Sequence, residues 1–519
     1  MSEAPQPLQQ ALLLVQQGKG HQAEPLLRQL MADQPQWPQP PYLLGLVLVQ
    51  NQRMAEAASA FAAACRLRPS LLAAWLNSAA ALEQLERLED AQDQLQQAMA
   101  WHPQQPDLLA AAGRLAIKLE SWSDAQALLE QALAAGVPIS RSGTHLGIAL
   151  LEQGEHHQAV AVLQQVVQQR PDDPQALYNL ALALKDAQQL EAALQVLDQL
   201  MIQAPQHPGL HGNRAIVLFL LGRYSEAWQE YHWRLVETPQ IVQRPELPEY
   251  HQQMGRVNRL LVLAEQGLGD SFQFVRYIDQ LSKHAASIRC VLQPALVPLV
   301  QHSFPDLEVV ASPWCQEHLN GVDAWLPLIS TASLLDVTPA QPQVLGPYLK
   351  VPDARQSHWQ QQLGSSQRKR IALVWQGNPE AERGHARGRS LPLAAFAPLM
   401  NADLELISLQ RGPGSEQIDA LGWRHHFHPL QSELDAVWAF EEVAAILKCC
   451  DLLISTDTAI THLAGALNHP ALLLLKWTPD WRWGLESEHC FWYPRHHLVR
   501  QKEDEPWEQT VLRMVENHL

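Results

Sequence analysis

The sequence predicts an α-helical repeat solenoid followed by an α/β region that contains two parallel sheets. Two observations support this prediction. In the first half, pairs of small residues recur every 34 residues, and in the second half short apolar runs alternate with amphipathic segments. At about 150 residues per domain, a chain of 519 residues has room for three to four domains.

The repeat is defined by small residues at two positions. One set lies 34 residues apart: Ala23, Ala57, Ala91, Ala125, Ala159, Ala193 and Ala227. Twelve residues before these lie Ala11, Gly45, Ala79, Gly113, Gly147, Ala181 and Ala215. Four residues after each alanine of the first set comes a large apolar or aromatic side chain, such as Leu27 or Phe61, on the same helix face. Antiparallel helix pairs need such small positions, because their backbones approach where side chains are short.

This pattern resembles the tetratricopeptide repeat (TPR) family, in about seven units over roughly residues 5–238. The resemblance implies a TPR solenoid over 1–238 whose concave face takes a peptide or partner protein. The repeats by themselves favour a helical solenoid with no chemistry of its own, and the sequence does not show what binds to it.

After the repeats, residues 239–257 read as a linker, and 258–350 predict a first α/β half. Its expected strands are 259–265, 287–293, 306–312 and 324–328, with a helix at 271–284. A Pro-, Gln- and Ser-rich stretch then predicts a second linker at 351–368.

Residues 369–519 predict a second half of the same kind with a closing helix near 504–518. The expected strands are 370–375, 404–410, 424–427, 451–455 and 471–475, and the expected helices 393–400, 439–449 and 459–467. Short apolar strands alternating with helices predict parallel sheets covered on both faces. Two such sets predict two Rossmann-like halves that face a cleft.

Polar, glycine and aromatic residues follow most of these strands. In open α/β sheets ligands bind beyond the carboxyl ends of the strands, so these residues are the candidates for a site. They are Gly267, Gly269, Asp270, Gln376, Asn378, Arg389, Ser390, Gln410, Thr456, Asp457, Thr458, His462, Trp481 and Arg482.

Asp270 follows a turn in which Gly267 and Gly269 allow close backbone approach. One reading is an ordinary turn in which Asp270 caps a helix. The other is that Asp270 faces the cleft as a general base that removes the proton of an acceptor hydroxyl as the new bond forms.

Thr456, Asp457 and Thr458 open a helix, and His462 lies one turn further on the same face. These residues either cap free backbone N–H groups or place a diphosphate at the helix N-terminus. Because Asp457 would repel phosphate, we assign the phosphate contact to Thr458 and the neighbouring N–H groups, and a cap or a sugar hydroxyl to Asp457. A lone helix histidine is often structural, which is the alternative for His462.

The loop with Arg383, Arg387 and Arg389 is either a solvated surface loop or a basic patch for phosphate, with Arg389 best placed, directly before a helix that we expect to start near Ser390. The tryptophans near 477–492, including Trp481, are either core residues or a platform for a nucleobase.

At these positions the second half resembles GT-B glycosyltransferases of the bacterial heptosyltransferase type, over roughly 258–510. The matching strings are EQGLGD, WQGNP, RS, SLQ, DTAITHLAGAL, DWRW and WYP. The resemblance implies inverting, metal-independent transfer from a nucleotide-diphospho-sugar, with Asp270 as base and Asp457, Thr458 and His462 at the donor. Repeats followed by a GT-B half are also similar in plan to O-GlcNAc transferase.

The sequence departs from that pattern in two places. The phosphate-binding lysine of some heptosyltransferases has no clear counterpart here, and Arg389 is the candidate substitute. Ala439-Phe440 stands where related sequences often carry Asp-Phe.

Composition limits the partners. A net charge of -17 excludes a duplex nucleic-acid binder, no apolar run is long enough for a membrane helix, and the N-terminus has no secretion signal. Six cysteines without a C-x-x-C pair indicate a reduced, cytoplasmic protein with no structural metal.

Our first hypothesis is therefore a cytoplasmic glycosyltransferase that binds a nucleotide sugar, needs no cofactor or metal, and uses its repeats to recruit a protein or glycan acceptor. The alternative is a non-catalytic scaffold with a degenerate GT-B module, and a nucleotide-sugar epimerase is a weaker third reading. The donor base, the sugar, the acceptor and the oligomeric state are left open by the sequence.

Overall fold

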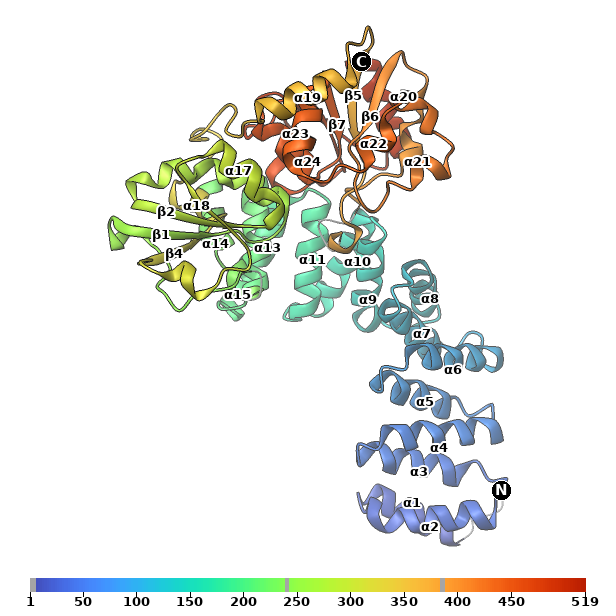
Figure 1. Ribbon diagram of the computed structural model, residues 1–519. Coiled ribbons are helices and arrows are strands. Elements are labelled where there is room, and N and C mark those ends of the chain that lie inside the picture. The colour runs from blue at the N-terminus through green and yellow to red at the C-terminus, as the bar shows by residue number, and fades with distance from the viewer. Residues whose placement is uncertain (1–5, 239–241, 383–387) are drawn as a thin grey trace. The chain divides into compact units, whose positions relative to one another are not determined.

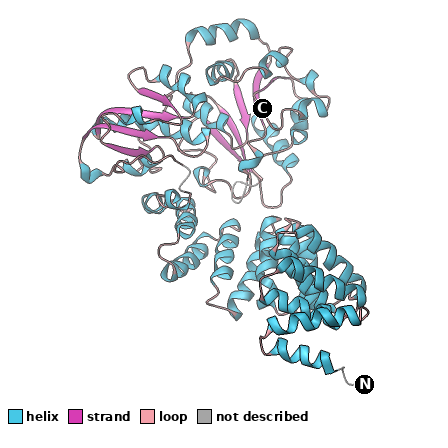
Figure 2. Ribbon diagram, turned by 60° about the horizontal axis from the view of Figure 1, so that its bottom comes forward, coloured by secondary structure: helices cyan, strands magenta, loops and turns pink. Residues whose placement is uncertain are grey.

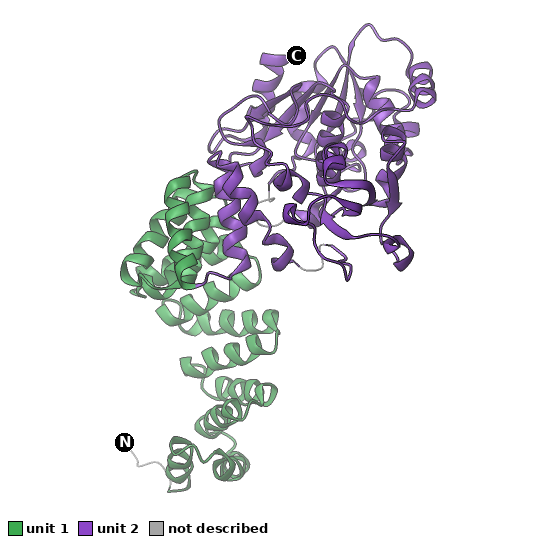
Figure 3. Cartoon of the chain, turned by 90° about the vertical axis from the view of Figure 1, so that its left-hand side faces the viewer, with its two compact units in different colours: residues 1–203 green, residues 204–519 purple. Residues whose placement is uncertain are grey.

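The structure is a computed structural model that describes residues 6–238, 242–382 and 388–519. It divides into two compact units, of which the first ends at Gln203 and the second begins at Ala204 (Figure 3). All described strands belong to the second unit (Figure 2).

The first unit consists of antiparallel helix pairs (Figure 1). Its helices are α1 Gln6–Gln16, α2 Gly20–Asp33, α3 Gln39–Gln50, α4 Met54–Leu67, α5 Leu72–Gln84, α6 Leu88–Trp101, α7 Pro106–Lys118, α8 Trp122–Ala134, α9 Ile139–Glu152, α10 His156–Gln169, α11 Pro174–Asp186 and α12 Leu190–Gln203.

The small residues of the repeat lie where the helices touch. The alanines of the 34-residue series are fully buried, and large apolar partners pack against the glycines of the other series. At Gly45, for example, a side-chain Cβ would lie 2.5 Å from the ring of Phe61. The predicted repeat solenoid is thus confirmed.

The seventh helix pair, α13 Pro208–Leu220 and α14 Tyr224–Tyr231, belongs to the second unit together with the short α15 Arg234–Glu237. The strands that follow are β1 Val257–Leu263, β2 Ala285–Leu292, β3 Glu308–Ala311, β4 Ala324–Pro327, β5 Lys369–Val374, β6 Leu404–Ser408, β7 Leu452–Ser455, β8 Ala471–Leu475 and β9 His496–Arg500. The α-helices between and after them are α16 Leu268–Phe274, α17 Val297–Ser303, α18 Ser330–Leu334, α19 Asp353–Leu363, α20 Ala397–Met400, α21 Gln417–Ala420, α22 Gln431–Asp435, α23 Phe440–Lys448, α24 Ala459–Ala466 and α25 Trp507–His518.

These strands form two entirely parallel sheets, with the orders β3-β2-β1-β4 and β6-β5-β7-β8-β9. In the second sheet, alternate residues such as Ile371, Leu373 and Ile454 pack on one face in a core that includes Val511 and Met514 of α25. Helices α23 and α24 cover the other face (Figure 1). The expected pair of α/β halves is therefore present.

Four local predictions differ from the structure. Residues 424–427 were expected to be a strand, but Arg424–His426 form a 3-10 helix and only Phe427 bridges to Leu406. The predicted linker 351–368 contains α19, whose Trp359 and Leu363 are buried. The sequence reading omitted β9 altogether.

The fourth difference is at Ser390, where no helix begins. Leu391 is instead tied to the preceding strand, because its N–H donates to the Trp375 carbonyl oxygen 2.8 Å away. The first helical residue is Leu393, in a 3-10 helix that leads into α20.

Among the described residues, no helix combines the length and the apolar character that crossing a bilayer requires.

Candidate active site

Each sheet has a point at which the chain order reverses. In the first sheet this point lies between β1 and β4, and in the second it lies between β5 and β7. Such switch points open a crevice at the carboxyl ends of the strands, where α/β proteins bind ligands. Asp270 follows β1, Gln376 follows β5, and Thr456 to Thr458 follow β7.

Asp270 lies at the third residue of α16, and Gly267, rather than Asp270, is the N-cap. One carboxylate oxygen of Asp270 accepts a hydrogen bond from the Gly267 N–H at 2.9 Å. The other oxygen lies 2.5 Å from Nη2 of Arg482 in the second half. The side chain is 18% exposed. Burial raises the pKa of Asp270, whereas Arg482 and the Gly267 N–H oppose that rise.

Arg482 joins the two halves. Its guanidinium pairs with Asp270 of the first half and, at 2.9 Å, with Asp480 of the second half. Its Nε donates to Oε1 of Gln273 in α16 at 2.8 Å. Burial by itself lowers the pKa of Arg482, but the charges of Asp480 and Asp270 outweigh this effect and raise the pKa well above its usual value.

His462 of α24 faces the same junction. A Cβ at Gly269 would lie 2.8 Å from Cδ2 of His462, so only glycine lets α16 come this close to α24. The Nδ1 atom is 2.8 Å from the Tyr493 hydroxyl, and Nε2 is 3.8 Å from Asp457. Burial lowers the pKa of His462 well below its usual value, which makes the imidazole neutral near pH 7.

Thr458 is the N-cap of α24, but its hydroxyl does not cap the helix and lies 3.1 Å from the Ser455 hydroxyl. The Thr456 hydroxyl is buried and has no hydrogen-bond partner among the described residues. The backbone N–H groups in the first turn of α24 therefore have no cap from the Thr458 side chain, a feature that anion sites at helix N-termini share.

Asp457 lies between Thr456 and Thr458 in the sequence. Burial and the charge of Asp480 raise its pKa to about 6, against the opposing charges of Arg389 and Arg482. An acidic group with a raised pKa in a crevice is typical of functional sites.

Arg389 lies at the loop after β5. Its Nε is 3.6 Å from Glu382, too long for a hydrogen bond, and has no hydrogen-bond partner in the described part of the chain. It also contributes an opposite charge to Asp457. Arg383 and Arg387 of the predicted basic loop lie outside the described residues.

The remaining candidates lie in the loop after β5 or form hydrogen bonds with it. The Gln410 side chain accepts from the N–H groups of Trp375 and Gln376 and donates to the Gln376 carbonyl oxygen. The Ser390 hydroxyl accepts from the Gly377 N–H at 2.8 Å. Asn378 is exposed and caps the short helix that begins at Pro379. Gln410 and Ser390 thus hold the loop after β5 through hydrogen bonds, and their contact with a donor remains a prediction.

Trp481 is not open to a nucleobase. It is 2% exposed, and the ring of Phe219 stacks on it with a centroid distance of 4.0 Å. Trp483 is buried as well and stacks against His462 at 5.4 Å.

Two polar residues of the first half were missed by the sequence reading. Gln273 contacts Arg482, and Arg276 donates to the Trp492 carbonyl oxygen and to the Tyr348 hydroxyl at 2.8 and 3.0 Å. Their spacing was the available signal, because Gln273 and Arg276 lie three and six residues after Asp270 within the otherwise mainly apolar segment SFQFVRY.

Over the residues that the structure describes, no group of three or more His, Cys, Asp or Glu side chains is arranged to hold a metal ion. Metal independence remains a prediction.

Comparison with protein families gives two kinds of match. The profile described as Glycosyltransferase family 9 (heptosyltransferase) matches residues 425–508, which contain Asp457, His462 and Arg482. Profiles described as tetratricopeptide repeat match residues 8–71, 42–107 and 150–215. Tetratricopeptide repeats thus precede a domain of the heptosyltransferase family, as the sequence predicted.

A curated relative is the protein FlbA of Caulobacter vibrioides. It is 25% identical over 500 residues, which cover 90% of this chain and 76% of FlbA.

Similar solved structures include YrrB and a MamA fragment. YrrB, described as a TPR protein with an unusual peptide-binding site, is 21% identical, covers 35% of this chain and 94% of its own, and has a TM-score of 0.32. A MamA fragment from Desulfovibrio magneticus RS-1 is 19% identical, covers 33% and 95%, and has a TM-score of 0.30.

Proposed function

We propose that this chain, in which tetratricopeptide repeats precede a glycosyltransferase family 9 domain, transfers a sugar from a nucleotide-diphosphate donor to a hydroxyl of a protein or glycan acceptor. Transfer proceeds with inversion and without a metal ion, and the repeats recruit the acceptor or a partner.

One observation supports this proposal above the others: strand-end residues from two separate halves converge. Asp270 of the first half pairs with Arg482 of the second, and Gly269 lies against His462. A bisubstrate transfer needs such a junction, because the acceptor and donor must be held within reach of each other.

In the proposed step, the acceptor oxygen attacks the anomeric carbon while its proton passes to Asp270. The bond from that carbon to the diphosphate oxygen breaks, and the nucleoside diphosphate leaves with the electron pair. A carboxylate has about four acceptor positions, and Gly267 and Arg482 occupy two of those of Asp270, so a hydroxyl can still bind there. The raised pKa of Asp270 suits a base that must also release its proton.

The leaving diphosphate would bind at the first turn of α24, with Thr456, Thr458 and Arg389. These residues offer uncapped backbone N–H groups, a buried hydroxyl without a partner among the described residues, and a guanidinium whose Nε has no hydrogen-bond partner there and lies 3.6 Å from Glu382. Donors placed in this way stabilise the charge that develops on the leaving group.

The test compares two substitutions that each remove one carboxylate partner of Arg482. Asp270→Asn should lower the transfer rate by about 10²–10⁴-fold, the usual contribution of a general base, and leave nucleotide binding intact. Asp480→Asn should lower it less than about tenfold, because it removes the other carboxylate partner of Arg482 and leaves the proposed base in place. Turnover is measured with the nucleotide sugar that most raises the melting temperature of the protein.

An equal loss of transfer rate in the two variants would show that Asp270 acts only as an ion-pair partner of Arg482. Normal turnover in Asp270→Asn would show that Asp270 is not the general base.

The scaffold alternative also has a specific observation in its favour, since both oxygens of Asp270 are already engaged. It predicts no thermal stabilisation by any nucleotide sugar. A single clear stabiliser contradicts it.

A further inference from the structure

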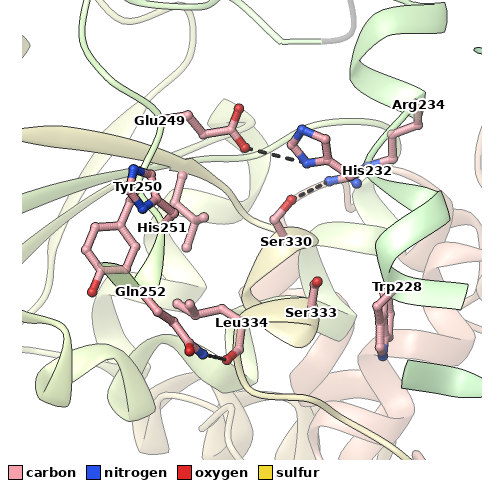
Figure 4. Close-up of a pocket in the computed structure, with 11 residues that line it drawn as sticks. Trp228, His232, Arg234, Glu249, Tyr250, His251, Gln252, Ser330, Ser333 and Leu334 are labelled. Atoms are coloured by element: carbon pink, nitrogen blue, oxygen red, sulfur yellow. Dashed lines mark hydrogen bonds and ion pairs between the residues drawn. The ribbon is translucent and has the colours of Figure 1, made fainter. Parts of the chain in front are cut away.

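A cavity of about 460 Å³ lies in the second unit, and its lining includes none of the candidate site residues (Figure 4). One wall comes from α14 and α15 of the last repeat, another from residues 249–252, and a third from the end of β4 and from α18. Since Ser330 and Leu334 follow β4, the cavity opens at the carboxyl edge of the first sheet, beside the switch point that carries Asp270.

The cavity has an apolar floor and a polar rim. Trp228, Tyr250 and Leu326 are buried, at 3–4% exposure. On the rim, the side chains of His232 and Glu249 are 52% and 33% exposed and lie 3.7 Å apart, and Ser333 is exposed (Figure 4). Such a pocket takes a group with an apolar body and a polar tip.

The charges exclude a phosphate ligand. Among the described residues that line the cavity, the only arginine is Arg234, which is buried, pairs with Glu265 and donates to the Ser330 hydroxyl at 2.9 Å. The rim adds the carboxylate of Glu249. A diphosphate would meet no free cation here, so the cavity differs from the donor site at α24.

A free strand edge lies beside the cavity. Residue 249 continues the first sheet, because the Trp325 N–H donates to Pro248 and the Tyr250 N–H donates to Trp325. The N–H and C=O groups of Glu249 itself must then point away from β4, and they have no hydrogen-bond partner within the described ranges. An unpaired sheet edge next to a side-chain pocket is the arrangement with which proteins bind extended peptides.

We propose that this cavity is a subsite for a polypeptide acceptor, which adds to the sheet edge at Glu249 and places one large, polar-tipped side chain between the last repeat and α18. This inference rests on the proposed transferase function and assigns its acceptor class.

The subsite and the base lie on one edge. From β1, whose loop carries Asp270, the sheet continues through β4 and residue 249 to the added peptide. Three steps of about 4.8 Å between strands make roughly 14 Å, which an extended peptide spans in about four to five residues. An added strand runs along the edge and not across the sheet, so the peptide must turn beyond the anchored side chain to reach Asp270, and at least about four to five residues separate that side chain from the modified hydroxyl.

The test fills the cavity in the full-length protein. Ser333→Trp and, from another wall, His251→Trp place a large ring in the cavity, and Ser357→Trp, on the exposed face of α19, is the matched control. The probes are a synthetic library of short peptides with one serine or threonine each, and free monosaccharides. Peptide glycosylation is measured by mass spectrometry, and hydrolysis of the nucleotide sugar without acceptor is measured in parallel.

We expect both cavity variants to lose at least about tenfold in peptide glycosylation, as loss of a central anchor does, with hydrolysis and melting temperature close to those of the control. Peptide transfer at the wild-type rate in either folded variant overturns the subsite. Transfer by the wild type to monosaccharides alone overturns the polypeptide assignment and keeps the transferase. A wild type that neither hydrolyses nor transfers any nucleotide sugar overturns the proposed function and, with it, the subsite.

Discussion

At the scale of single residues, the candidate site places several charged side chains close together. Three carboxylates, Asp270, Asp457 and Asp480, share the junction with Arg389 and Arg482, and His462 is held neutral. A planar guanidinium suits the place between two carboxylates, because its donors are arranged in a fixed fork. Arg482 satisfies Asp270 and Asp480 in this way, whereas within the described residues Asp457 forms no salt bridge with either arginine and lies 3.8 Å from Nε2 of His462.

The titration of Asp457 should therefore make the stability of the second unit depend on pH. Its pKa is raised to about 6 in the folded protein, so it holds its proton more tightly there than in the unfolded chain. A raised folded pKa contributes stability that is fully present below about pH 4 and is lost as the pH rises through about 6. A shift of about two units corresponds to about 3 kcal/mol at most.

We predict that Asp457→Asn removes this loss. The melting temperature of the second unit should fall between about pH 4 and pH 8 more steeply in the wild type than in the variant. Calorimetry across this range checks the difference, with Asp451→Asn, an exposed aspartate in the same half, as the control. Parallel profiles for all three proteins would contradict the assignment.

The sequence predicts those site residues whose place in the fold follows from their position after a strand. Polar residues directly after apolar strands, such as Asp270 and Thr458, must come to the carboxyl edge of a parallel sheet. The pairing of Asp270 with Arg482 joins residues 212 positions apart and depends on how the two halves close, which no local pattern encodes. For the same reason the stack of Phe219 on Trp481 was not foreseen.

At the scale of elements, the repeats contain a local defect with a sequence explanation. In six of the seven repeats, a leucine lies three residues after the small residue of the first helix. These leucines are Leu14, Leu48, Leu82, Leu150, Leu184 and Leu218. The fourth unit has Ala116 at this position. A groove of about 360 Å³ lies there, between α6 and α8 with α7 as its floor, and Ala116 and Leu128 are among its lining residues.

We predict that Ala116→Leu stabilises the first unit by about 1–2 kcal/mol, because it restores the side chain of the other units in a space that already exists. Leu150→Ala, the reverse change in the next unit, should cost about 2–5 kcal/mol. Urea unfolding of both variants checks these values. A destabilised Ala116→Leu would show that the groove closes in solution and that the leucine overpacks it.

Elements with a strong pattern were predictable and those without one were not. Strands such as 370–375 are continuous apolar runs, which only a buried strand or a buried helix explains. In β9, HHLVR, histidines and an arginine flank two apolar residues, so no run is visible, although His496 is buried. Helix α19 buries only Trp359 and Leu363 and otherwise reads as a polar linker.

At the scale of the whole molecule, the last repeat has a double role. The series of small residues continues into α13 and α14, but these helices belong to the second unit. Phe219 of α13 stacks on Trp481, and Trp228 of α14 donates to the Val337 carbonyl oxygen at 2.7 Å. Arg234 of α15 pairs with the buried Glu265, five residues before Asp270. The last repeat is thus part of the core that positions the proposed base.

The final prediction concerns where the chain can be cut. A protein that begins at Ala204 keeps this core and should unfold in one cooperative transition at the temperature of the second unit in the full chain. A protein that begins at residue 258, where the sequence alone places the first α/β half, loses Phe219, Trp228 and Arg234. Burial of each aromatic side chain contributes about 1.5–3 kcal/mol, and an unpaired buried Glu265 costs about 3–5 kcal/mol. Together these losses approach the whole stability of a typical domain, so we expect the shorter protein to lack a cooperative transition in calorimetry and to expose tryptophan in fluorescence. If it unfolds at the same temperature as the longer protein, the last repeat is only an attachment, and acceptor recruitment has to be sought further back along the solenoid.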